Sequence, residues 1–306
     1  MPHQFRQVHL ADHGLLNDSN NCCMNCVILC CHRMGLGSFL VDPGQVVHRG
    51  EPDYPILLLN KVLDALPPTG SAAFSLQMFI SSWNLRAQMH GLNRPFFGQY
   101  EDILICDTII GAMMPYLRQM DPPVFTKYAA KFFCINCHVP YRNIEEGQFR
   151  MFQCIPILSL PLSGQSVSPG QLLTTFLDTT FDAACPLCNN LCNGAVYEAT
   201  CGRFTLLALN RRDGYRDAQG NLIPKVMTRL SVLGSNNRGD QLCGELVSVI
   251  CHSGDPAGGH WVSYHKCDND TWWCNDDSRP VYQIHHHPFN GSRSDETVDF
   301  LVYKNF

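Results

Sequence analysis

The chain has 306 residues, of which 45% are apolar and only 16% are charged. This composition can fill a large hydrophobic core, which excludes a disordered, coiled-coil or collagen-like chain. The formal net charge is -5 and there is no run of basic residues, so nothing favours binding to nucleic acid or to an anionic membrane. We therefore expect a globular protein with no nucleic-acid partner and no membrane partner.

The cellular compartment follows from two further features. No apolar stretch reaches the ~18 residues that span a bilayer, and the N-terminal segment MPHQFRQVHLADHG lacks the apolar centre of a secretory signal. We expect a soluble chain in the cytoplasm or the nucleus. There the 17 cysteines, odd in number and scattered, are expected to be buried thiols, metal ligands or a nucleophile rather than disulfides.

The first 120 residues are expected to be mostly helical. Residues 22–34 form an apolar run without Gly or Pro, preceded by the polar string NDSNN that can cap a helix. Helical patterns also occupy 56–66, 75–89 and 100–120. The first of these three ends at two consecutive prolines.

Beyond Pro123 the pattern changes to short apolar runs with a period of two, which is typical of strands. One helical pattern, at 169–181, interrupts them. Strands are predicted within 150–162, 203–212, 225–234, 245–254, 260–266 and 298–306. The fold class is therefore α+β, with a helical region followed by a largely antiparallel sheet.

Three Cys-x-x-Cys pairs occur in the sequence. The first, Cys23 with Cys26, lies inside the helix predicted at 22–34, where both side chains are expected to pack as small apolar groups. The consecutive histidines at 285–287 are not expected to form a metal site, because adjacent residues of a strand point to opposite faces.

The second and third pairs, Cys134 with Cys137 and Cys185 with Cys188, each lie at a turn between strand-like runs. Two such knuckles facing each other would supply four thiolates to one Zn²⁺ ion. Four cysteines close the tetrahedral shell of zinc, so the predicted site is structural. Ordinary buried thiols are the alternative, and one ligand could instead be His138, Cys154 or Cys192.

A candidate nucleophile stands at the start of the helix predicted at 22–34. Cys22 would lie at the positive end of the helix dipole, which favours a thiolate over a thiol. The preceding Asn17, Asn20 and Asn21 could each place an amide where an oxyanion develops.

A matching base is predicted near the other end of the chain. His260 follows two glycines and opens a strand with clear alternation, and Asp276 lies one hairpin later. In adjacent antiparallel strands these residues can face each other. Asp276 would then accept the imidazole N–H and fix the tautomer that deprotonates Cys22.

Taken together, these segments resemble the catalytic domain of the ubiquitin-specific proteases, which are papain-like deubiquitinating cysteine proteases. The family's first box, G-L-x-N-x-G-N-T-C-Y-M-N-S, is similar to GLLNDSNNCCMNC at 14–26. Its second box, H-x-G with G-H-Y-x-x-Y and W-Y-x-F-D/N-D-S, is similar to the segments His252–Gly254, Gly259–Tyr264 and Trp272–Ser278.

The resemblance implies a role for each matched residue. Cys22 would be the nucleophile, His260 the general base and Asp276 its orienting partner, with Asp277 beside it. Asn17 would help to form the oxyanion hole. The substrate would be the C-terminal Gly-Gly tail of ubiquitin or a related modifier and its conjugates.

The resemblance also implies one catalytic domain over 1–306. About 1–120 would form a helical thumb, about 121–205 zinc-binding fingers with part of the palm, and about 206–306 an antiparallel β palm. The sequence departs from the family boxes at Asn21, Cys23 and Asn275, which replace Thr, Tyr and Phe. Three alternatives stay open: a protease for another modifier such as SUMO, a ubiquitin-binding scaffold with weak catalysis, and a zinc-dependent interaction module.

Overall fold

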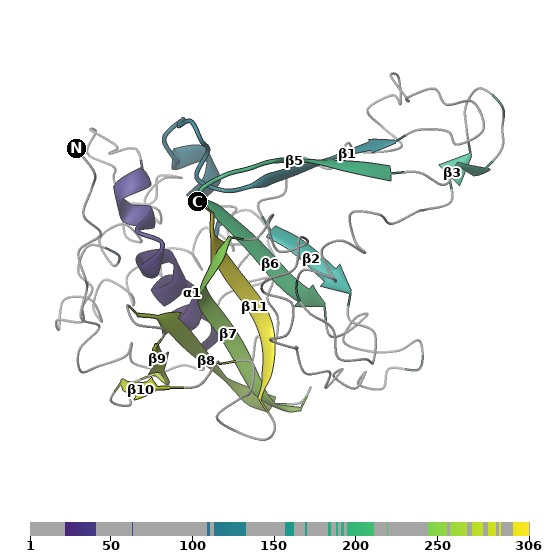
Figure 1. The fold of residues 1–306 in the computed structure, drawn as a ribbon. Coiled ribbons are helices and arrows are strands. Elements are labelled where there is room, and N and C mark those ends of the chain that lie inside the picture. The colour runs from purple at the N-terminus through teal and green to yellow at the C-terminus, as the bar shows by residue number, and fades with distance from the viewer. Residues whose placement is uncertain are drawn as a thin grey trace, which may run out of the picture.

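The computed structural model describes seventeen stretches of the chain, which contain one long helix, α1, and three β-sheets (Figure 1). The described residues are 22–40, 63, 109–110, 113–132, 157–161, 169, 183–184, 188, 191–192, 195–210, 219, 244–255, 258–267, 271–277, 281–285, 288 and 296–305. The helix predicted at 75–89, the strand predicted at 225–234 and nearly all of the helices predicted at 56–66 and 169–181 lie outside these residues.

Helix α1 spans Cys22–Arg33, which confirms the predicted helix and its start. All residues from Cys22 to Cys31 are buried, as expected for a helix that is apolar on every side and lies inside the protein. Gly35 follows with a φ of 68°, the left-handed conformation that ends many helices, and its N–H bonds to the His32 carbonyl at 2.8 Å. Among the residues that the structure describes, no helix is long and apolar enough to cross a bilayer.

The helix predicted at 100–120 ends earlier than expected. After a short 3₁₀ helix, η2 (Met114–Tyr116), the chain becomes extended at Leu117. Leu117 forms an antiparallel bridge with Leu40, which directly follows the 3₁₀ helix η1 (Leu36–Phe39). The prediction of helix up to residue 120 is therefore wrong, because pairing with a distant segment replaced the local helical bonds.

A seven-stranded sheet forms the centre of the described structure. Its strand order is β10-β9-β8-β7-β11-β6-β2, and only the β2–β6 pair is parallel. The strands are β2 (Ile157–Pro161), β6 (Phe204–Asn210), β7 (Glu245–Asp255), β8 (Gly258–Lys266), β9 (Trp272–Asn275), β10 (Tyr282–Ile284) and β11 (Thr297–Lys304). The largely antiparallel sheet and five of the six predicted strand regions are thereby confirmed.

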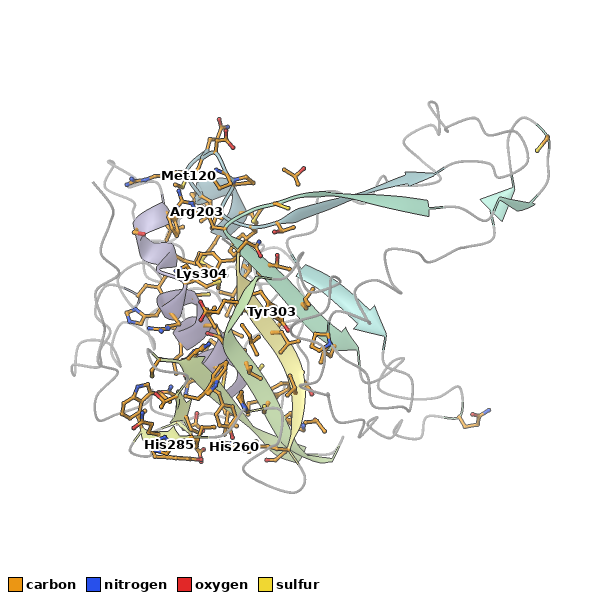
Figure 2. All side chains as sticks on the ribbon, in the orientation of Figure 1. Met120, Arg203, His260, His285, Tyr303 and Lys304 are labelled. Carbon is orange, nitrogen blue, oxygen red and sulfur yellow. The ribbon has the colours of Figure 1, made fainter. Side chains whose placement is uncertain are left out.

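Alternation along the strands divides the apolar residues between the two faces of this sheet. Trp261 and Phe300 belong to the core cluster shared with α1. Their neighbours Val262, Tyr264 and Leu301 belong to a second cluster on the opposite face. Figure 2 shows the dense packing of side chains between α1 and the sheet. The helix is thus fixed against β7 and β8, the strands that lead to the predicted base.

A two-stranded antiparallel ribbon extends away from the sheet (Figure 1). It consists of β1 (Lys127–Phe132) and β5 (Ala195–Thr200), with Phe132 opposite Ala195 at one end. A short hairpin of β3 (Ala183–Ala184) and β4 (Leu191–Cys192) precedes β5. The chain therefore leaves β1 and enters β5 at the same end of the ribbon.

Candidate active site

Helix α1 and strand β8 bring the two ends of the chain together. Cys22 is the first residue of α1 and is 8% exposed. His260 lies near the start of β8, and the nearby Cys22 thiol is the largest cause of the raised pKa of its imidazole. Two residues separated by most of the sequence therefore meet where a helix N-terminus favours negative charge.

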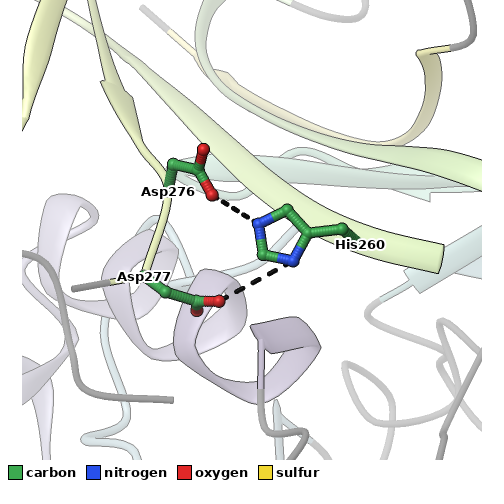
Figure 3. Close-up of side chains that lie close together, drawn as sticks. All are labelled: His260, Asp276 and Asp277. Carbon is green, nitrogen blue, oxygen red and sulfur yellow. Dashed lines mark hydrogen bonds and ion pairs between the residues drawn. The ribbon is translucent and has the colours of Figure 1, made fainter. Parts of the chain in front are cut away.

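The opposite side of the imidazole is held by Asp276. Strands β8 and β9 pair with Ser263 opposite Asn275, so the end of β9 places Asp276 beside His260. The Asp276 Oδ1 accepts a short hydrogen bond from Nε2 of His260 (Figure 3). Asp276 is 2% exposed, whereas the His260 side chain is 29% exposed. Because Nε2 is occupied by Asp276, Nδ1 is the ring nitrogen left for Cys22.

Asp277 approaches the same ring from the Nδ1 side. Its Oδ2 lies 3.7 Å from Nδ1 of His260 (Figure 3). The Asp277 backbone has a φ of 51°, which is uncommon for a residue other than glycine. Its other carboxylate oxygen, Oδ1, accepts a hydrogen bond of 3.1 Å from the Asn25 side chain on α1. Asn25 therefore connects the helix that begins at Cys22 to the turn that carries both carboxylates.

These surroundings raise the pKa of His260 from 6.5 to about 9. The hydrogen bond with Cys22 contributes most, and partial burial acts in the opposite direction. The hydrogen bond with Asp276 and the negative charges of Asp276 and Asp277 raise the pKa further. This raised pKa favours the protonated imidazole at neutral pH, and a protonated imidazole can serve as a general acid.

The residues on either side of His260, Gly259 and Trp261, fix the backbone that carries the imidazole. A Cβ on Gly259 would lie 2.2 Å from His252 Nε2 and 2.3 Å from the Ser253 carbonyl oxygen, so only glycine fits there. The His252 ring packs against Trp261 with centroids 4.6 Å apart. The segment before the imidazole is thus enclosed by side chain and backbone of the paired strand β7.

The other predicted site residues are less completely described. Asn17, Cys134, Cys137 and Cys185 lie outside the described residues, whereas Cys188 is half-buried. His285 is exposed just beyond β10, at the same end of the sheet as His260, and His286 and His287 are not described (Figure 2). Both members of the first Cys-x-x-Cys pair, Cys23 and Cys26, are buried in the core as predicted.

Asn25 is the residue of this site that sequence reasoning missed. The sequence pattern predicts only that Asn25 lies on the helix that begins at Cys22. The available signal was an amide within a run of otherwise apolar and cysteine residues, in a helix that is buried from Cys22 to Cys31. A buried amide requires a hydrogen-bond partner, and here that partner is 252 residues away.

Comparisons with known proteins agree with this geometry. Residues 137–303, more than half of the chain, match the family model described as ubiquitin carboxyl-terminal hydrolase. No curated protein matches the sequence.

Several solved structures share the fold. One is the SAGA Ubp8/Sgf11/Sus1/Sgf73 DUB module bound to ubiquitin aldehyde, with 16% identity, a TM-score of 0.63 and coverage of 99% of this chain and 71% of that chain. The same module bound to monoubiquitin gives 17% identity, a TM-score of 0.62 and coverage of 95% and 68%. A yeast SAGA DUB module with an Sgf73 variant gives 17% identity, a TM-score of 0.59 and the same coverage. The family match and the shared fold show that this chain belongs to the ubiquitin carboxyl-terminal hydrolase family, as a cysteine-type hydrolase of the ubiquitin-specific protease group.

Proposed function

We propose that this chain hydrolyses the peptide or isopeptide bond after the C-terminal Gly-Gly of ubiquitin, with Cys22 as the nucleophile. The observation that carries the proposal is the imidazole of His260, which Asp276 holds by a hydrogen bond to Nε2 and whose pKa the nearby Cys22 thiol raises. Similar solved structures contain ubiquitin aldehyde and monoubiquitin, which supports ubiquitin as the modifier.

The proposed reaction has two steps. The Cys22 thiolate attacks the carbonyl carbon of the terminal glycine, and protonated His260 gives its proton to the departing lysine amine. Water, deprotonated by His260, then attacks the thioester and releases the modifier. Asp276 keeps the proton on Nε2 and so leaves Nδ1 as the nitrogen that exchanges protons with Cys22 and substrate.

The negative charge that develops on the carbonyl oxygen needs hydrogen-bond donors. We assign this role to the Asn17 amide together with backbone N–H groups at the start of α1. One such donor is typically worth about 10²- to 10³-fold in rate. Asn17→Ala is therefore expected to retain slow turnover. Cys22→Ala is expected to bind the modifier but to hydrolyse no substrate.

A structural zinc ion is a second part of the proposal. Its ligands would be Cys134, Cys137, Cys185 and Cys188, in two pairs that would form the tip of the fingers. The chain order supports this set, because the first pair follows β1 in the sequence and the second lies between β3 and β4, and the chain leaves β1 and enters β5 at the same end of the ribbon. Metal-binding energy is folding energy in such a site. Chelation should lower the melting temperature and weaken modifier binding, and active protein that contains no zinc would contradict this part.

The cellular setting is also proposed. The similar structures come from a module that contains Sgf11, Sus1 and Sgf73, so assembly of this chain with accessory proteins of comparable type is a reasonable extension. We infer action on ubiquitin conjugates in the nucleus or the cytoplasm. Co-purification of the tagged chain with stoichiometric partners would test the assembly.

The decisive experiment is reaction with electrophilic C-terminal probes of ubiquitin, SUMO and other modifiers, read by intact mass. An adduct with the ubiquitin probe is expected on the native chain and on Cys23→Ala, a control that removes the adjacent buried thiol. Cys22→Ala should give none. An adduct with the SUMO probe alone would mean that the modifier is SUMO rather than ubiquitin. A folded, zinc-containing chain that reacts with no probe would support the ubiquitin-binding scaffold instead.

A further inference from the structure

The His260 imidazole lies between two carboxylates that approach it to different extents (Figure 3). Asp276 Oδ1 accepts a hydrogen bond from Nε2. Asp277 Oδ2 lies 3.7 Å from Nδ1, whereas an N–H···O hydrogen bond spans roughly 2.7–3.2 Å. One ring nitrogen is therefore bound by a carboxylate, and the other faces a carboxylate that stops short of it.

The distance between Asp277 and the ring is longer than the charges alone would set. A protonated imidazole attracts a carboxylate, and a charge-assisted N–H···O bond is about 2.7–2.9 Å long. A movement of less than about 1 Å would thus let Asp277 Oδ2 bind Nδ1. The Asp277 side chain is only 10% exposed, so bulk water solvates this carboxylate weakly. A contact within the protein has to keep the carboxylate at its observed distance.

Asn25 on α1 supplies such a contact. Its Nδ2 donates a hydrogen bond of 3.1 Å to Oδ1 of Asp277, while Oδ2 is the oxygen nearest to the ring. Asn25 is 1% exposed, in a helix that is buried from Cys22 to Cys31. Because close packing leaves a buried side chain little room to move, the amide is a fixed point from which the carboxylate is held.

The backbone of Asp277 shows that this turn is held in place by its surroundings. Its φ of 51° lies in the left-handed region, which is costly for residues other than glycine and least so for Asn and Asp. Such a conformation persists where neighbouring contacts fix it. The bond from Asn25 is one of these contacts. Asp277→Asn therefore suits the backbone, keeps the size of the side chain and removes only its charge.

We propose that Asn25 is a positioning residue, whose hydrogen bond holds the Asp277 carboxylate away from Nδ1 of His260 and keeps this nitrogen available for proton transfer. Without that bond, Asp277 would close on Nδ1 and form an ion pair that competes with proton transfer. The restraint does not depend on turnover. Its catalytic consequence rests on the proposed function, in which Nδ1 exchanges protons with the nucleophile and the substrate.

The first test follows the titration of His260 by NMR in the chain without substrate. In Asn25→Ala the closer carboxylate should raise the pKa of His260 above its native value of about 9, by about half a unit, because a nearer negative charge favours the imidazolium. Asp277→Asn should lower this pKa. Asn25→Ala combined with Asp277→Asn should titrate like Asp277→Asn alone. A pKa that does not rise in Asn25→Ala, or that rises equally in both backgrounds, would overturn the proposal.

Val27→Ala is the matched control for a loss of stability. Val27 is also buried on α1, at 1% exposed, and its truncation leaves a cavity without removing a hydrogen bond. This variant should lower the melting temperature and leave the pKa of His260 unchanged. Asn25→Ser, whose hydroxyl is too short to reach Asp277, takes the place of Asn25→Ala if that variant does not fold.

The second test measures hydrolysis of a fluorogenic ubiquitin substrate. Asn25→Ala should lower kcat by about 10-fold with little change in KM, because the restraint acts on proton transfer. In the Asp277→Asn background the same substitution should cost no further activity. An equal loss in both backgrounds would mean that Asn25 acts only on the general fold, which would overturn the proposal. A chain that shows the expected titrations yet hydrolyses no substrate would refute the proposed function alone.

Discussion

The α-carbon of Gly259 lies so close to the His252 ring that a Cβ would lie 2.2 Å from Nε2. The same Cβ would lie 2.3 Å from the carbonyl oxygen of Ser253, which follows His252 on strand β7. Because one obstacle is backbone, a side-chain rotation cannot relieve the clash. Any side chain at this position must displace the start of β8, and with it the imidazole of the next residue.

Gly259→Ala is therefore expected to lower kcat/KM by about 100-fold, the scale of loss when reacting groups are displaced by roughly 1 Å. Gly35→Ala is the matched control. Its φ of 68° makes alanine strained, at roughly 1–2 kcal/mol. A Cβ at Gly35 would make only an ordinary contact, 3.9 Å from Ser38 Oγ, and the residue lies past the far end of α1. Melting temperature and hydrolysis of a fluorogenic ubiquitin substrate should be measured for both. An equal loss of activity in the two variants would contradict the special role of Gly259.

The pKa of His260 is raised to about 9, and the interaction with its neighbour Cys22 is the largest of the several causes. Removing the sulfur in Cys22→Ala should bring the pKa of His260 down toward 6.5, while the bond to Asp276 holds it above that value. NMR of the His260 ring resonances over a pH series would measure the titration midpoint in the native chain and in Cys22→Ala. Cys23→Ala should titrate like the native chain, and identical midpoints in the native chain and Cys22→Ala would disprove the contact.

The same raised pKa predicts a pH-dependent stability. The folded state holds a proton on His260 up to about pH 9, whereas the unfolded state releases it near 6.5. The stabilising contribution is thus complete below pH 6.5 and is lost as the pH rises from 6.5 to about 9. The difference in melting temperature between the native chain and His260→Gln should shrink across that interval. A melting-temperature difference that grows with pH would contradict a raised pKa for His260.

Local pattern was sufficient to predict the parts of the fold that depend on periodicity. Helix α1 and strands such as β8 and β11 repeat apolar residues with a period that the sequence displays directly. The pairing of His260 with Asp276 was accessible because a short hairpin separates them. The contact between Asn25 and Asp277 was not, because nothing in local sequence specifies a partner 252 residues away.

The predicted end of the helix at 100–120 was wrong for the same physical reason. Helical propensity describes neighbours along the chain, whereas the bridge between Leu117 and Leu40 is a tertiary contact. The hydrogen bond from the Arg118 N–H to the Phe39 carbonyl, at 2.8 Å, continues that contact. Such pairing between distant segments overrides a weak local preference.

Two buried asparagines, Asn25 and Asn275, offer a paired test of hydrogen bonding. Asn275 is 2% exposed, and within the described part of the chain neither its amide nitrogen nor its oxygen has a hydrogen-bond partner. Asn25 is 1% exposed and donates to Asp277. An unpaired buried polar group costs about 1–3 kcal/mol. Replacing it with an apolar residue of similar size should recover part of this cost.

Asn275→Leu is therefore expected to raise the free energy of unfolding by part of that cost, whereas Asn25→Leu is expected to lower it by about 1–3 kcal/mol. Chemical denaturation of the two variants beside the native chain would measure both changes. If Asn275→Leu proved as destabilising as Asn25→Leu, the Asn275 amide would have to be hydrogen-bonded after all.

The last prediction concerns the junction between the ribbon and the sheet. Just beyond β11, the Asn305 side chain donates hydrogen bonds to Thr126 Oγ1, the Gly202 carbonyl and Thr205 Oγ1, at 3.0, 2.7 and 2.9 Å. It thereby connects the end of β11 to the segments that enter β1 and leave β5. Asn305→Ala should lower the free energy of unfolding by about 1–3 kcal/mol.

The effect of Asn305→Ala should be confined to the ribbon end of the molecule. Figure 2 shows Arg203 and Lys304 at that end and His260 at the other. Hydrogen exchange should therefore increase in β1 and β5, whereas alkylation of Cys22 should keep its native rate. If the ribbon positions the modifier, KM for ubiquitin substrates should rise more than kcat falls. A loss in kcat with unchanged hydrogen exchange in β1 and β5 would instead mean that Asn305 acts on the catalytic residues. That result would contradict a role for the ribbon in modifier binding.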